Sequence, residues 1–160
     1  MVIVVMGVSG SGKTTVGTAL ARRLGVQYAE ADEFHPPENV AKMSSGTPLN
    51  DDDRWPWLQA IAVWIREHQQ TGGVVTSSAL KRKYRDVLQT GGDVFFVHLD
   101  GTRELIAERL AGRKGHFMPA ALLDSQIADL EPLQPDEPGV VLDIEAEPDE
   151  IVEAAVRATR

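Results

Sequence analysis

The chain has 160 residues and a formal net charge of −8 at pH 7, and it contains no cysteine. The missing cysteine excludes disulfides and cysteine-based zinc sites, and the negative charge argues against a nucleic-acid duplex as partner, because no basic excess is left to neutralise phosphates. We expect a single cytoplasmic domain over residues 1–160, since no apolar run approaches the ~20 residues of a membrane span and the N-terminus lacks the basic region of a signal peptide.

The first predicted element is a β-strand that leads directly into a glycine-rich loop. Residues 2–6 are apolar and mostly β-branched, and residues 7–14 read G-V-S-G-S-G-K-T, which matches G-x-x-x-x-G-K-[ST] at every position. A helix with apolar residues spaced by four follows and is expected to stop at Gly25. Strand, loop and helix are the context that this phosphate-binding motif requires, so we predict that the chain binds a nucleoside triphosphate.

The motif predicts a role for each part of the loop. Backbone N–H groups would wrap the phosphate chain, and the helix N-terminus adds the positive end of its dipole. Lys13 would reach the β- and γ-phosphates of ATP, and the Thr14 hydroxyl would bind Mg²⁺. The predicted ATP-binding residues are Gly7, Val8, Ser9, Gly10, Ser11, Gly12, Lys13, Thr14 and Thr15.

Four later segments, residues 27–31, 73–77, 94–99 and 139–142, are predicted to be strands. The last two contain continuously apolar runs, which are typical of strands buried on both faces of a parallel sheet. The Pro-rich residues 131–138 are expected to form a surface loop before the last strand.

Helical patterns lie between the predicted strands, in residues 58–65, 105–110 and 123–130, and Pro119 and Pro148 fit first helical positions. This alternation predicts an α/β fold of the P-loop kinase type, with a five-stranded parallel sheet, helices on both faces and an added lid segment.

A parallel sheet predicts where the chemistry lies, because its ligand crevice forms at the carboxyl ends of the strands. Residues 30–32 follow the second strand, Ser77 and Ser78 follow the third, and Asp100 follows the fourth. We expect these polar groups to converge on the edge that carries the phosphate loop.

Asp32 is the candidate for contacting a phosphoryl acceptor. An acceptor hydroxyl needs a carboxylate that orients it and can take its proton. The alternative is that Asp32 only caps the turn at residues 35–37. We favour the functional interpretation, because the end of this strand is expected to lie beside the phosphate loop.

The segment 42–58 contains an acidic run followed by a cation. Residues 51–53 fit the first turn of the next helix, and we interpret them as capping residues. A cation in the same turn opposes the helix dipole, so a binding role for Arg54, such as gripping a carboxylate, is favoured. The three tryptophans, Trp55, Trp57 and Trp64, are interpreted as packing residues.

Two further pairs of cations could serve the site. Lys81 and Arg85 are four residues apart just beyond the third strand and are predicted to face the acceptor pocket together, whereas Arg82 and Lys83 are interpreted as a solvated face. Arg109 and Arg113 share a helix face and are predicted to belong to a lid that brings them to the phosphoryl group. The alternative is that they are ordinary exposed surface residues.

The ordered set of motifs from residue 2 to about residue 131 resembles the gluconokinase family. The matching segments are the phosphate loop, D-E-F-H-P at 32–36, Lys42-Met43, P-L at 48–49 with R-W-P-W-L at 54–58, S-A-L-K at 78–81, Y-R-D at 84–86, G-H-F-M at 115–118 and Ser125-Gln126. The family pattern often has Cys-Ser at Ser77-Ser78 and Ser-Thr at Thr14-Thr15. Both differences keep the needed hydroxyls.

The resemblance implies transfer of the γ-phosphate of ATP to the 6-hydroxyl of D-gluconate, in a Mg²⁺-dependent and commonly dimeric enzyme that feeds the pentose phosphate or Entner–Doudoroff pathway. It implies catalytic roles for Lys13, Asp32, Arg109 and Arg113. The implied substrate-binding residues are Asp32, His35, Lys42, Arg54, Ser78, Lys81, Arg85 and His116.

Two alternatives remain open. One is another kinase of this fold, acting on shikimate or a nucleoside monophosphate; a shikimate kinase would be expected to have Gly-Gly-Gly where this chain has residues 77–79. The other is a P-loop regulatory protein without an acceptor, although the chain lacks the N-K-x-D motif of a GTPase switch.

Overall fold

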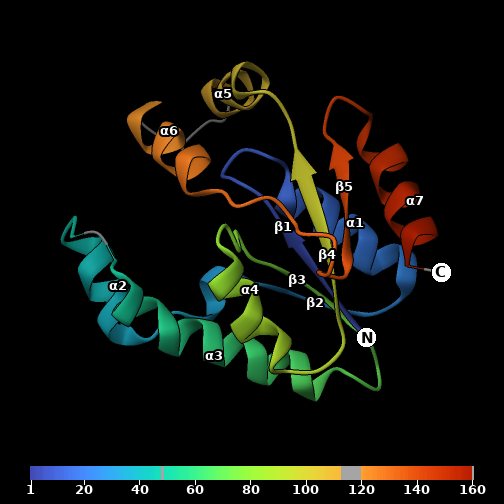
Figure 1. The fold of residues 1–160 in the computed structure, drawn as a ribbon, viewed down its shortest axis with the longest axis horizontal. Helices are drawn as coiled ribbons and strands as arrows, with labels where there is room; N and C mark the ends of the chain where they lie inside the picture. Colours follow the sequence, from blue (N-terminus) through green and yellow to red (C-terminus); the bar gives the residue numbers. More distant parts are fainter. Residues whose placement is uncertain (48, 113–119, 160) are drawn as a thin grey trace.

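The sheet is parallel throughout and has the strand order β2-β3-β1-β4-β5 in the computed structural model, which describes residues 1–47, 49–112 and 120–159 (Figure 1). Its strands are β1 (Val2–Met6), β2 (Gln27–Glu30), β3 (Gly73–Thr76), β4 (Val94–Asp100) and β5 (Gly139–Asp143). All five predicted strands are confirmed.

Helices connect successive strands. They are α1 (Lys13–Leu24), the 3₁₀ helix η1 (Ala31–Phe34), α2 (Pro37–Ser44), α3 (Asp51–Glu67), α4 (Arg82–Gln89), α5 (Arg103–Ala111), α6 (Ala120–Asp129) and α7 (Pro148–Ala158). Pro148 opens α7 as predicted, whereas Pro119 lies outside the described residues. None of the described helices has the length and apolarity that a membrane crossing needs.

Side chains of the central strand β1 alternate between two hydrophobic cores, because successive residues of a strand point to opposite faces. Ile3 and Val5 pack with residues of α1 and α7, whereas Val2, Val4 and Met6 pack with residues of α3 and α4. Figure 1 shows these two helix pairs on opposite sides of the sheet. The predicted arrangement with helices on both faces is therefore confirmed.

The expectation that the last strand is buried on both faces is wrong. β5 lies at the edge of the sheet, paired with β4 alone, and its residues alternate between exposed and half-buried. Its apolar sequence resembles that of a central strand, yet Val141 is exposed. The strands that are buried along their whole length are β1 and β3.

The carboxyl edge of the sheet brings most of the predicted polar groups together. Residues after β1, β2 and β3 line one pocket at this edge. Asp100, at the end of β4, differs from the expectation: it lines a separate cavity with Thr102 and Asp143. The functional edge is thus centred on β1, β2 and β3.

Candidate active site

The phosphate loop needs glycine for steric reasons, as Gly7 and Gly12 illustrate. At Gly7 the backbone has a φ of +149°, and a Cβ there would lie 2.8 Å from the carbonyl oxygen of Leu99. At Gly12, directly before α1, φ is +93°. This is the left-handed region of the backbone, which residues other than glycine adopt only at a cost in free energy. These glycines let the loop turn tightly from β1 into the N-terminus of α1.

The side chains of the loop point in different directions. Val8 belongs to the hydrophobic core and Ser11 is buried, and the Ser11 backbone N–H donates to the carbonyl oxygen of Val8 at 3.2 Å. The Lys13 ammonium donates to the carbonyl oxygens of Gly7, at 2.9 Å, and Val8, at 3.2 Å, and it therefore lies over the loop. Thr15 lines a second cavity, described below.

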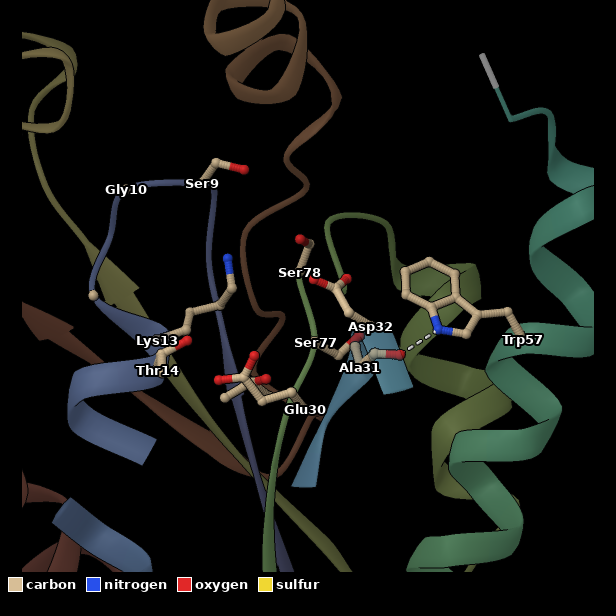
Figure 2. Close-up of a pocket in the computed structure, with 12 residues that line it drawn as sticks. Ser9, Gly10, Lys13, Thr14, Glu30, Ala31, Asp32, Trp57, Ser77 and Ser78 are labelled. Carbon is tan, nitrogen blue, oxygen red and sulfur yellow. Dashed lines mark hydrogen bonds between the residues drawn. The ribbon is translucent and has the colours of Figure 1, made fainter. Parts of the chain in front are cut away.

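A pocket of about 180 Å³ opens beside the loop. Figure 2 shows Lys13 and Thr14 on one side of this pocket and Asp32 and Trp57 on the other. Glu30 lies between the two sides, and its carboxylate accepts a hydrogen bond from the Tyr28 hydroxyl at 2.8 Å. The full lining is Ser9, Gly10, Gly12, Lys13, Thr14, Glu30, Ala31, Asp32, Trp57, Thr76, Ser77 and Ser78.

Asp32 presents a carboxylate to this pocket. It lies in η1, directly after β2, and its side chain is 89% exposed. Lys13 and Thr14, from the opposite side of the pocket, come from the start of α1. A carboxylate and a phosphate-binding lysine facing one space is the arrangement that phosphoryl transfer to a hydroxyl requires.

Behind Asp32, the ring of His35 is stacked on Trp57, with ring centroids 4.0 Å apart and an interplanar angle of 19°. The Trp57 indole N–H donates to the carbonyl oxygen of Ala31 at 2.7 Å, which ties α3 to the end of β2 (Figure 2). The interpretation of Trp57 as packing alone is therefore incomplete, because it also lines the pocket. The sequence feature that indicates this inward position is the spacing of Trp57 four residues before Ile61, which lies on the buried face of α3.

Arg54 lies in a polar cluster between α3 and α4. Its Nη1 is 3.3 Å from both Asp51 Oδ1 and the Tyr84 hydroxyl, and that hydroxyl donates to Asp51 Oδ1 at 2.7 Å. Hydrogen bonds from Lys83 and Tyr84 hold the pKa of Asp51 below its ordinary value. Burial, together with the hydrogen bond to Asp51, raises the pKa of Tyr84 to about 12. Lys81 Nζ lies 5.9 Å from the centroid of the Tyr84 ring.

Of the acidic residues predicted to cap α3, Asp53 does so, whereas the Asp51 side chain accepts hydrogen bonds from α4. Asn50 is the N-cap, and it forms a capping box with Asp53, each side chain accepting from the other residue's backbone N–H at 2.9 Å. Lys42, a predicted substrate-binding residue, donates to the Asp53 carboxylate at 2.8 Å and 3.0 Å. The Lys42 charge is thus neutralised within the structure.

The prediction that Arg85 faces the acceptor pocket with Lys81 is wrong. Arg85 is 0% exposed, and its guanidinium forms hydrogen bonds of 2.6 Å and 3.0 Å with the buried carboxylate of Glu137. A further hydrogen bond of 2.9 Å reaches the carbonyl oxygen of Ala79, which has a left-handed φ of +47°. Arg85 therefore holds the turn after β3, which carries Ser77 and Ser78 to the pocket.

Arg109 lies at a different cavity from Asp32. Its guanidinium donates to the carbonyl oxygen of Ile144 at 2.6 Å and lines a cavity of about 220 Å³ with Thr15 and Pro148. Gly10 and Gly12 of the phosphate loop line both cavities, so Arg109 adjoins the nucleotide side of the loop. Arg113 and His116 lie outside the described residues.

Gln126 contacts the phosphate loop, which the residue chemistry of the sequence did not predict, although Ser125-Gln126 is one of the motifs that carry the family resemblance. It lies in α6, and its Oε1 accepts from the backbone N–H of Ser9 at 2.8 Å. Its Nε2 lies 3.2 Å from the Ser9 hydroxyl. The helix that follows the predicted lid thus contacts the phosphate loop directly.

The sheet order, the phosphate loop and the shared pocket define a P-loop kinase. The shikimate kinase family model matches residues 9–154. The gluconokinase of Gluconobacter oxydans (strain 621H) is 52% identical over an alignment of 159 residues that covers 97% of this chain and 89% of that protein. The chain belongs to the gluconokinase family, within the shikimate kinase-like group of P-loop kinases.

Solved structures agree with this assignment. A sugar kinase from Janibacter sp. HTCC2649 has 52% sequence identity and a TM-score of 0.90, with 99% of this chain and 93% of that chain covered. A gluconokinase from Sinorhizobium meliloti 1021 has 47% identity and a TM-score of 0.88, with 98% and 89% covered. The fold expected from the sequence is therefore confirmed at the level of the whole domain.

Proposed function

We propose that this protein is a gluconokinase, which transfers the γ-phosphoryl group of ATP to the 6-hydroxyl of D-gluconate and gives 6-phospho-D-gluconate and ADP. The observation that carries the proposal is the pocket that Lys13 and Thr14 of the phosphate loop share with Asp32. Membership of the gluconokinase family supports the choice of acceptor.

In the proposed reaction Asp32 orients the acceptor hydroxyl and takes its proton. A bond forms between the hydroxyl oxygen and the γ-phosphorus, while the bond from that phosphorus to the β–γ bridging oxygen breaks and ADP leaves. Lys13 stabilises the negative charge that spreads over the phosphoryl oxygens. We propose that Arg109 and Arg113 add to this stabilisation.

The pocket also fits a magnesium ion. The Thr14 hydroxyl and the Glu30 carboxylate are hard oxygen donors, which Mg²⁺ prefers, and they line one space. When bound with ATP, Mg²⁺ neutralises charge on the β- and γ-phosphates. We propose Thr14 as its ligand from the loop.

We further propose that the gluconate carboxylate and hydroxyls are bound by Lys42, Arg54, Ser78 and Lys81, with His116 contributing from outside the described residues. His35 would act on the acceptor through Asp32. Ser78 lines the pocket, and Arg54 and Lys81 both lie near the Tyr84 ring. Arg85 is not among them, because it is buried against Glu137. Cytoplasmic location, a homodimer and a role in the pentose phosphate or Entner–Doudoroff pathway are proposed from the resemblance alone.

A coupled assay of ADP release with D-gluconate, shikimate and nucleoside monophosphates as acceptors tests the proposed function. We expect ADP release with gluconate and formation of 6-phospho-D-gluconate, and no comparable rate with the others. Lys13→Ala is the control for contaminating kinases and should be inactive. Release of ADP with shikimate or a nucleotide, but not with gluconate, would refute the proposal.

A further inference from the structure

Asn39, in α2, is a buried amide next to the acceptor side of the pocket. It is 2% exposed, and its Nδ2 donates to the carbonyl oxygen of Asp53 at 2.9 Å. The same nitrogen lies 3.4 Å from Nδ1 of His35. The side chain therefore connects the first turn of α3 with the histidine behind Asp32.

The contact with Asp53 fixes which way the amide points. A backbone carbonyl oxygen can only accept a hydrogen bond, so the NH₂ end of Asn39 must face it. The backbone of Asp53 is itself held by the capping box with Asn50. One N–H of the amide is then used on Asp53, and the other is available for His35.

Because this second N–H is a donor, His35 Nδ1 must be the acceptor and carry the lone pair. A neutral imidazole with its lone pair on Nδ1 has its proton on Nε2. The environment favours the neutral ring, since burial lowers the pKa of His35, with Asp32 opposing the shift. The stack on Trp57 restrains rotation of the ring.

The proton assigned to Nε2 faces the proposed catalytic carboxylate. His35 Nε2 lies 4.0 Å from Asp32 Oδ1, and the His35 side chain is only 6% exposed, in contrast to the exposed Asp32. An exposed carboxylate can rotate freely unless a donor holds one oxygen. Nε2–H is such a donor, once a small rotation of the Asp32 side chain closes the distance.

We propose that Asn39 is a positioning residue that fixes His35 as the neutral Nε2–H tautomer, so that His35 orients the Asp32 carboxylate toward the acceptor hydroxyl. A neutral donor orients the carboxylate without the cationic charge that would reduce its basicity. This inference rests on the proposed function only for the role of Asp32. The tautomer itself follows from the contacts of Asn39.

The first test is a long-range ¹H–¹⁵N correlation spectrum of the ¹⁵N-labelled wild-type protein near neutral pH, without substrate. The His35 ring is assigned through nuclear Overhauser contacts with Trp57. We expect a protonated Nε2 and an unprotonated Nδ1. A proton on Nδ1, in either the other tautomer or the imidazolium, would overturn the inference, whether or not the protein phosphorylates gluconate.

The second test replaces the donor by an acceptor of the same shape. Asn39→Asp should place a proton on His35 Nδ1 and lower kcat for gluconate by about 10-fold to 100-fold, as expected for a group that orients a reacting residue, while KM for ATP stays unchanged. Asn50→Asp is the matched control, because it makes the same charge change at an N-cap where both residues are favourable; it should retain the wild-type tautomer and kcat.

A changed tautomer in Asn39→Asp with wild-type kcat would overturn the positioning role. An equal loss of kcat in Asn50→Asp would also overturn it, since the effect would then arise from the added charge. If Asn39→Asp does not fold, the wild-type spectrum still decides the tautomer, and Asn39→Leu, which removes the donor without adding charge, should lower kcat and not the ATP KM.

Discussion

At the scale of single residues, the proposed chemistry depends most on the carboxylate of Asp32. The side chain reaches into the pocket from the end of β2, opposite Lys13 and Thr14. Residues of the phosphate loop, in contrast, would contact only the nucleotide.

Replacing Asp32 by Asn should therefore reduce turnover and leave nucleotide binding intact. We expect Asp32→Asn to lower kcat for gluconate by about 10²-fold or more, the usual contribution of a positioned general base, with KM for ATP little changed. Steady-state kinetics with both substrates varied measures this. Asp52→Asn, an exposed carboxylate in the first turn of α3, is the matched control. A higher KM for ATP with unchanged kcat would place Asp32 on the metal–nucleotide side.

Residues whose roles depend on local sequence could be predicted, and residues whose partners are distant could not. The loop at residues 7–14 and the placement of Asp32 follow from a motif and a strand end. The burial of Arg85 depends on Glu137, which lies 52 residues further along the chain. No local pattern around Arg85 distinguishes a buried structural cation from one that faces a ligand.

At the scale of elements, Arg85 and Glu137 join α4 to the segment that precedes β5. The segment 131–138 is a largely exposed loop, as expected, but Glu137 is buried within it. Burial alone would raise the pKa of Glu137, yet the hydrogen bonds from Arg85 and the backbone of Gln134 outweigh it and hold the pKa below its ordinary value. The pair is therefore ionised in the folded protein.

Removing one partner of this pair should destabilise the fold strongly. We expect Glu137→Gln to lower the free energy of unfolding by about 3–5 kcal/mol, because it leaves the Arg85 charge buried without a counter-ion. The double variant Arg85→Met/Glu137→Leu should recover most of that loss. Asp136→Asn, which breaks the exposed pair with Arg82, should cost much less, because water screens an exposed ion pair. Urea unfolding of the three variants measures this, and equal losses in Glu137→Gln and Asp136→Asn would contradict the account.

The position of β5 could not be predicted from its composition. Val-Val-Leu is as apolar as the runs in β1 and β3. An apolar run indicates burial, but it does not distinguish a central strand from one at the edge of the sheet. Strand order is decided by the crossover connections, which place β4 between β1 and β5. The alternation of strands and helices, by comparison, was sufficient to predict a parallel sheet.

At the scale of the whole molecule, a buried histidine makes stability depend on pH. His98, in β4, is 4% exposed, and its Nδ1 has no hydrogen-bond partner among the described residues. Burial, aided by the nearby Arg85 charge and opposed by Asp100, lowers the pKa of His98 in the folded protein. The unfolded chain, with a histidine pKa of about 6.5, then binds more protons than the folded protein on acidification.

The contribution of His98 to the free energy of unfolding should consequently be constant above pH 6.5. It should fall as the pH decreases below that value. One proton difference gives a slope of up to about 1.4 kcal/mol per pH unit. Urea unfolding between pH 8 and pH 5 measures the slope, which should be smaller in His98→Gln. The pKa of His35 is also lowered by burial, so part of the slope should persist in that variant. An unchanged slope in His98→Gln would contradict this prediction.

The charge of the molecule also bears on the acceptor. A chain with a net charge of −8 repels an anionic sugar acid unless local cations offset the repulsion. Arg54 and Lys81 both lie within 6 Å of the Tyr84 ring centroid. This cluster is where we propose that the gluconate carboxylate is recognised.

The most direct test of the central claim is kcat/KM for D-gluconate and for D-glucose, in the wild type and in Arg54→Ala. Glucose has the same 6-hydroxyl but no carboxylate for the cations of the site to bind, and we expect wild-type discrimination of up to about 10⁴-fold. Arg54→Ala should lose most of its kcat/KM for gluconate and little of the weak rate with glucose, whereas Arg66→Ala, an exposed arginine of the same helix, should match the wild type. Equal wild-type values for the two sugars, or equal losses on both in Arg54→Ala, would contradict a site built to recognise gluconate.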